Sequence, residues 1–199
     1  DLLEHCAAPP DGGTSETQRL RTNPWYPPTP EDLEALVEQC GIRSDVPPVM
    51  GLEPGEAGEN AERMGLSEGE VPIVDAAIRR LHQQFREQLR QLYLEATGDD
   101  AGAESLSADA MLAQIGSAAL PGEVREAHRQ VARERAGQVE PPANLEELSP
   151  AARSIRLHAG LGDAYQRMLA AELGEERAHE LRAAAGGWPW GRSYSRTCR

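Results

Sequence analysis

Histidines are the side chains of this sequence best suited to bind a metal or to transfer a proton, and four of its five histidines fall in stretches with helical periodicity. Ferritin-like di-metal sites need two Glu-x-x-His motifs and two further glutamates, all pointing inward. This chain has one such motif, Glu176–His179, in a short segment near its C-terminal end. A histidine beside an apolar stripe is also found as a packed core or boundary residue, and that alternative applies to each histidine here. The candidates for a metal site are His82, His128, His158, Glu176 and His179.

Other catalytic patterns are missing from the sequence. It contains no Cys-x-x-Cys, Walker A, G-x-G-x-x-G or G-x-S-x-G motif. The paired acids Asp99–Asp100 and Glu146–Glu147 fall in predicted loops, where solvation accounts for them. The sequence therefore gives no positive signal for an enzyme, and it predicts neither a catalytic residue nor a cofactor.

Three cysteines, Cys6, Cys40 and Cys198, lie outside the central helical stretches. Cysteines near chain ends and at the end of a helix suit a disulfide that ties down irregular segments. We expect one disulfide, with Cys40–Cys198 favoured over Cys6–Cys40, which leaves one thiol over. The alternative is three free thiols in a reducing compartment. A disulfide indicates an extracytoplasmic protein, either periplasmic or secreted.

The charge of the chain excludes two classes of partner. Its formal net charge is −13, and all 20 basic residues are arginine. Phosphate backbones and anionic lipid surfaces repel such a chain, so we expect neither nucleic-acid nor membrane-surface binding. No apolar run approaches the roughly 18–20 residues that span a bilayer. A protein partner is the remaining expectation, and the sequence leaves the oligomeric state open.

The longest predicted helix covers residues 66–98. Ser67 and Glu70 have the spacing of a capping box, but Pro72 would fall where it removes a hydrogen-bond donor. The pattern therefore predicts one capped turn, a break, and a long helix from about Val71 that ends at Gly98. Apolar residues at steps of three and four form one buried stripe: Val71, Val74, Ile78, Leu81, Phe85, Leu89, Leu92 and Ala96.

A second long helix is predicted from Ser149–Pro150 to about Leu173, antiparallel to the first. Gly160 and Gly162 lower its helix propensity but would let another backbone approach closely. Shorter helices are expected from Thr29 to Cys40, near 59–64, at 107–118, from Pro121 to about 137 and at 174–187. Residues 98–105 are predicted to be a flexible link. The predicted helix after Pro121 carries Arg133, Glu134 and Arg135 as an exposed, ion-paired face.

These elements predict an all-α protein. Two long antiparallel helices and several short ones are wrapped by irregular ends. We expect residues 1–65 to be a Pro/Gly-rich N-terminal wrap with one short helix and 66–187 to be the helical core. Residues 188–199 form a docked tail with three large aromatic residues, Trp188, Trp190 and Tyr194.

A recurring phrase opens the predicted helices, with an apolar residue, a capping residue and nearby acids. It occurs as LSEGE at 66–70, LS at 106–107, LSP at 148–150 and LGEER at 173–177. This pattern resembles the LTxxQ helical family of bacterial periplasmic stress proteins, the Spy and CpxP type, over 66–98 and 149–185. The Thr and Gln of that motif are absent from this chain. The resemblance implies an all-helical periplasmic protein that senses envelope stress or chaperones unfolded chains, in some members with a response to metals.

The sequence as a whole favours a non-catalytic extracytoplasmic helical protein that works by interaction, chaperoning or stress sensing. One alternative is a helix-bundle metal-binding protein or metal-dependent enzyme that uses the histidines named above. A second alternative is an accessory subunit of a larger envelope assembly.

Overall fold

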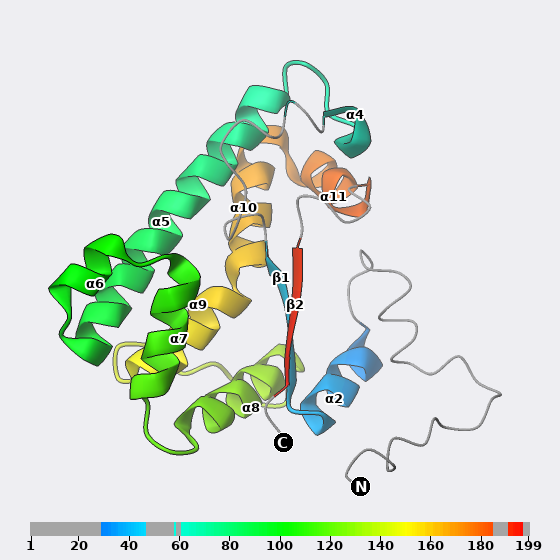
Figure 1. Cartoon of the computed structure of the whole chain (residues 1–199). Coiled ribbons are helices and arrows are strands. Elements are labelled where there is room, and N and C mark those ends of the chain that lie inside the picture. The colour runs from blue at the N-terminus through cyan, green and yellow to red at the C-terminus, as the bar shows by residue number, and fades with distance from the viewer. Residues whose placement is uncertain (1–28, 47–57, 59–60, 185–190, 197–199) are drawn as a thin grey trace, which may run out of the picture.

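Helix α5, Val71–Thr97, is the longest element of the protein and runs along one side of it (Figure 1). The computed structural model describes residues 29–46, 58, 61–184 and 191–196. Phe85 and Leu89 on α5 are 2% and 0% exposed, so the predicted stripe faces the core. The buried residues of α5 are Val74, Ala77, Ile78, Leu81, Phe85, Leu89, Leu92 and Tyr93.

The predicted break at the start of α5 is confirmed. The Ser67 N–H donates to Glu70 Oε2 at 2.8 Å, which forms one half of the capping box. A turn follows, and the helix begins at Val71 with Pro72 in its first turn. A proline there lacks an N–H that would have no partner within the helix anyway. At the other end Gly98 takes a left-handed φ of 68° and closes the helix, as predicted.

The segment predicted to be a flexible link is instead helix α6, Asp100–Ser105. Asp99 caps it, because one carboxylate oxygen accepts the Gly102 N–H at 3.0 Å. The second oxygen lies 2.8 Å from the buried Tyr93 hydroxyl on α5. A Cβ at Gly102 would come within 2.3 Å of that hydroxyl oxygen, so glycine permits the close approach. The link prediction was wrong because the Asp99 side chain caps a short helix, and the Tyr93 hydroxyl on α5 holds that carboxylate in place.

The second long helix is divided into α9, Pro150–Ala159, and α10, Leu161–Leu173. Gly160 ends α9, and its N–H donates to the Arg156 carbonyl. Glycine favours a break at this point because it is a poor former of helix interiors. The start is as predicted, since the Ser149 hydroxyl accepts the Ala152 N–H at 3.2 Å. Both halves still pack on α5.

The remaining helices fall close to their predicted positions. Thr29 caps the first with a complete capping box to Asp32. The helix predicted from Pro121 begins two residues later, after Gly122 with its φ of 85°. These helices are α2 (Pro30–Glu38), α4 (Ala61–Met64), α7 (Ala108–Ala118), α8 (Glu123–Arg135) and α11 (Glu175–Ala184).

Two strands, which the sequence analysis did not predict, pair in an antiparallel sheet. Strand β1, Gly41–Val46, places Gly41 opposite Arg196 of β2, Gly191–Arg196. Each strand is only six residues long, so neither carries a strong period-two signal. Their pairing joins the two ends of the described chain. β1 lies against α2, α8, α9 and α10 (Figure 1).

The mostly helical class is confirmed, with this small sheet as an addition. The larger buried cluster surrounds α5, and a smaller one joins Ile42 of β1 to Val131, Ala132 and Ala159. Most of the predicted N-terminal wrap, together with Trp188 and Trp190 of the predicted tail, lies outside the described residues. In the described part of the chain, every helix is too short or too polar to cross a bilayer.

Candidate functional site

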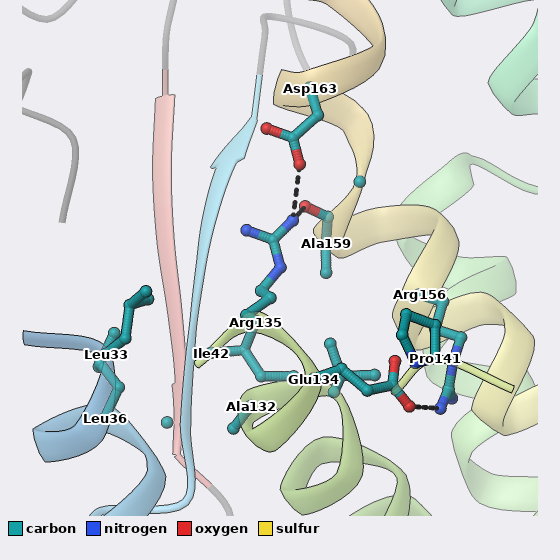
Figure 2. A pocket seen from close by; sticks show the side chains of 13 residues that line it. Leu33, Leu36, Ile42, Ala132, Glu134, Arg135, Pro141, Arg156, Ala159 and Asp163 are labelled. Atoms are coloured by element: carbon teal, nitrogen blue, oxygen red, sulfur yellow. Dashed lines mark hydrogen bonds and ion pairs between the residues drawn. The ribbon is translucent and has the colours of Figure 1, made fainter. Parts of the chain in front are cut away.

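A recess beside β1, which we call the Arg135 recess, has a volume of about 450 Å³ (Figure 2). It lies between α2 and the α8–α10 helices. Its apolar wall combines residues from α2, β1 and α8, whereas its charged groups come from α8, α9 and α10. Its lining is Leu33, Leu36, Gly41, Ile42, Val131, Ala132, Glu134, Arg135, Pro141, Arg156, Ala159, Gly160 and Asp163.

Arg135 holds the break between α9 and α10. Its Nη2 donates to the carbonyl of Ala159, the last residue of α9, and to Asp163 Oδ2 at 3.1 Å (Figure 2). A cation at the C-terminal end of one helix and an acid in the first turn of the next both suit the helix dipoles. One guanidinium therefore bridges the end of α9 and the start of α10 and forms one side of the recess.

A nearly buried ion pair lies beside Arg135. Arg156 Nη2 donates to Glu134 Oε1 at 2.5 Å, and these side chains are 12% and 9% exposed. Within the described part of the chain, the Nε of Arg156 has no hydrogen-bond partner. The prediction that Glu134 and Arg135 belong to an exposed face was therefore wrong, although Arg133 is exposed. A signal was present, because these two residues follow the buried Val131 by three and four positions and so share its face. Arg156 and Asp163 were not predicted as site residues.

A second, smaller recess adjoins the first, and we call it the His hollow. Its volume is about 200 Å³, and it shares Ile42 and Ala159 with the Arg135 recess. It lies between β1, α7, α8 and α9. Its lining is Ile42, Leu112, Gly116, Val124, His128, Ala151, Ser154, Ile155, His158 and Ala159.

The two histidines of the His hollow differ in their hydrogen bonding. His128 Nδ1 lies 2.8 Å from the Val124 carbonyl. A carbonyl only accepts, so the neutral ring carries its proton on Nδ1 and keeps Nε2 as an acceptor. Burial lowers the pKa of His158; Asp109 opposes this effect and His128 adds to it. Burial therefore favours the uncharged form of His158.

The metal-site candidates lie in three places. His128 and His158 line one hollow, His82 is half-buried on α5, and Glu176 and His179 are exposed on α11. Within the described ranges, no group of three or more His, Cys, Asp and Glu side chains is placed to hold a metal. The two-motif arrangement of a di-metal bundle is therefore not assembled from the described residues.

Cys40 directly precedes two residues that line the Arg135 recess. It ends the α2 segment with a left-handed φ of 46° and is disulfide-bonded. Its neighbours Gly41 and Ile42 line the Arg135 recess. The other two cysteines, Cys6 and Cys198, lie outside the described residues.

A separate ion-pair cluster fastens the start of α5 to α11. Arg177 Nε and Nη2 donate to the two carboxylate oxygens of Glu70 at 2.6 and 3.0 Å, and Nη2 also donates to the Gly65 carbonyl. The hydrogen bonds from Arg177, and to a smaller extent those from Ser67, lower the pKa of the Glu70 carboxyl to about 2. The arrangement is a bidentate clamp that positions helices rather than a site with space for a ligand.

Comparisons of the chain with protein-family models, with curated proteins and with solved structures give no match. The two recesses are therefore the features of the described residues that bear on function.

Proposed function

We propose that this chain is a non-catalytic interaction protein that acts outside the cytoplasm and holds a basic segment of a protein partner in the Arg135 recess. The observation that carries the proposal is the recess itself. Its volume of about 450 Å³ lies within the range of ligand pockets, and it joins an apolar wall to a few fixed charges. Such a recess suits one apolar anchor side chain flanked by polar contacts.

The rim of the recess favours a basic partner. Helix α2 contributes Leu33 and Leu36 to the apolar wall and exposes Glu31, Glu34 and Glu38 to solvent. This helix carries no basic residue, and the whole chain has a net charge of −13. Acidic surfaces attract basic partners and repel acidic ones, and this attraction steers a basic partner towards the surface before binding.

Chaperone work on unfolded chains is supported less well. Among the described residues, the large apolar side chains that are exposed are Leu120 and Leu145, at 74% and 49%. Two such residues do not form the broad apolar patch that holds many sequences. The recess supports recognition through a single anchor, and a permanent partner in a larger assembly would use the same contacts.

The metal-binding alternative keeps one supporting observation, the approach of His128 and His158 in the His hollow. A structural zinc site usually takes four protein ligands, and two histidines fall short of that. Metal analysis of the purified full chain tests this alternative, which would require a bound metal that is lost when both histidines are replaced.

The partner's chemistry can be tested with three short synthetic peptides of equal length, in which Arg alternates with Leu, Arg with Ser, or Glu with Leu. We expect the Arg–Leu peptide to bind most tightly to the full chain, and its affinity to fall with added salt. Fluorescence anisotropy measures each affinity.

Two matched variants test whether the peptide binds in the Arg135 recess. Leu33→Asp puts a charge on the wall of the recess and should weaken Arg–Leu binding about tenfold or more. Leu120→Asp makes the same change at an exposed position between α7 and α8 and should leave the affinity unchanged. Equal effects of the two variants, or equal binding of the Glu–Leu and Arg–Leu peptides, would contradict the proposal.

The extracytoplasmic location is supported by the disulfide at Cys40, since disulfides persist in oxidising compartments. The register that places Gly41 opposite Arg196 supports Cys198 as its partner, because Cys198 follows Arg196 by two positions. With three cysteines in the chain, a thiol count on the denatured, unreduced protein should give one free thiol. Peptide mapping should find the Cys40–Cys198 bridge, whereas three free thiols would contradict both the bridge and the location.

A further inference from the structure

The His hollow is a second recess with its own chemistry. At about 200 Å³ it is less than half the size of the Arg135 recess, and Ile42 and Ala159 lie between the two. An engineered apolar cavity of about 150 Å³ binds benzene, so this hollow has room for one aromatic ring and a small substituent. Its size therefore suits a small molecule rather than a peptide.

The walls of the hollow are mainly aliphatic, with Leu112, Val124 and Ile155 among them. Its polar side chains are His128, Ser154 and His158. The Ser154 hydroxyl donates to the Ala151 carbonyl at 2.9 Å, which uses its proton within α9. The hydrogen-bonding capacity open to a ligand therefore lies mainly on the two imidazoles.

Each imidazole offers a different part of that capacity. The contact of His128 Nδ1 with the Val124 carbonyl leaves Nε2 as an acceptor. His158 makes no hydrogen bond to any other described residue, so its ring can both donate and accept. A single hydroxyl group, which is itself both donor and acceptor, complements this pair.

The electrostatics of the hollow select against charged ligands. His158 lies near Asp109 of α7 and His128 of α8, and burial, the largest effect on its pKa, favours its uncharged form. The uncharged form of His158 that burial favours does not compensate the cost of burying a carboxylate or phosphate, and Asp109 adds repulsion. An apolar ring with a neutral hydroxyl has no charge to bury and is not repelled by Asp109.

We propose that the His hollow binds a small neutral aromatic molecule that carries a hydroxyl group, of the phenol class, with His158 as its main hydrogen-bonding partner and His128 as the second. This site goes beyond the proposed interaction function and does not depend on it, because the ligand and the partner segment occupy different recesses.

Titration of the full chain with phenol, toluene and benzoate, followed by NMR of the histidine rings, tests this proposal. We expect saturable phenol binding that shifts the His128 and His158 resonances, weaker toluene binding and no benzoate binding. His158→Phe keeps a ring of similar shape without its nitrogens. This variant should remove the preference for phenol over toluene. We expect that preference to be about tenfold in the original chain, the factor that one hydrogen bond gives.

Gly116 provides a variant that fills the hollow without disturbing the core. It lines the hollow on α7, and a Cβ built there meets nothing within 4 Å. Gly116→Leu should therefore fold and abolish phenol binding. Ala113→Leu adds a side chain on the exposed face of the same helix and should bind phenol as the original chain does.

Three results would overturn the proposal. They are no saturable phenol binding by the original chain, phenol binding that survives Gly116→Leu, and equal affinities for phenol and toluene. Zinc titration serves as a further control. Zinc coordination by both histidines in a chain that does not bind phenol would assign the hollow to a metal instead.

Discussion

The core around α5 and the junction around β1 are built on different principles. The α5 core is formed by apolar side chains on helices, and its members include Val74, Leu89 and Tyr165, each 0% exposed. The junction around β1 has a small apolar cluster, a nearly buried ion pair and both recesses. Helices with regular stripes fill the space between them, whereas the packing around β1 leaves the two recesses open.

This difference indicates where binding chemistry can arise in a helical protein. Close packing in the α5 core leaves little space for a ligand and stabilises the fold. At the junction, Arg135 and the Glu134–Arg156 pair connect α8 to α9 and α10 beside the two recesses. The close-packed core and the two recesses therefore lie in largely separate regions, although Ala151 of the core cluster also lines the His hollow.

The largest expected effect compares one aliphatic residue from each region. Leu89→Ala, in the α5 core, should lower the free energy of unfolding by about 3–5 kcal/mol, because it leaves a cavity that its neighbours cannot fill. Ile42→Ala, at the junction, should cost about 2 kcal/mol, since the new space opens into recesses that already exist. Urea denaturation measures both values. Equal costs would contradict the distinction between the two regions.

The second comparison concerns ion pairs on α8. Removing one partner of a nearly buried pair leaves the other charge uncompensated, so Glu134→Ala should cost about 2 kcal/mol. Glu126→Ala breaks the exposed pair with Arg129 on the same helix and should cost less than about 0.5 kcal/mol. A double-mutant cycle with Arg156→Met measures the coupling. A Glu134–Arg156 coupling no larger than that of the exposed pair would contradict the buried role.

The smallest expected effect is a pH dependence from the clamp at the start of α5. The pKa of Glu70 is lowered from 4.5 to about 2, so its contribution to stability is present above pH 4.5 and is lost as the pH falls towards 2. Arg177→Ala should raise the pKa of Glu70 towards its ordinary value, and NMR titration of the side-chain carboxyl measures this shift. Glu180→Ala removes the other acid bound to Arg177 and should leave the pKa of Glu70 low. A pKa of Glu70 near 4.5 in the original chain would contradict the clamp.

The elements predictable from the sequence are those whose signals are local. Ser67, Pro72 and Gly98 gave the start and end of α5 because capping and proline geometry depend on a few neighbouring residues. The α6 helix was missed although its cap is local, since Asp99 accepts the Gly102 N–H; the added bond from the Tyr93 hydroxyl is not visible in the sequence. The break at Gly160 was signalled by its low propensity, but the sequence alone did not show whether tertiary contacts would override that propensity.

The candidate site was predictable only in part. His128 and His158 were named as candidates, but the sequence could not show that they share one hollow while Glu176 and His179 lie on another helix. The recess beside Arg135 was missed because its lining comes from segments far apart in the chain.

The amino-acid sequence by itself determined the helical class, the acidic surface and the apolar stripe of α5, because periodicity, capping and charge are properties of short stretches of chain. The tertiary structure alone decided that β1 pairs with β2, that Arg135 spans the break between α9 and α10, and that two histidines face one hollow. Each of these features depends on contacts between residues that are far apart in the chain. The conformational preferences of short stretches do not determine which distant residues come into contact.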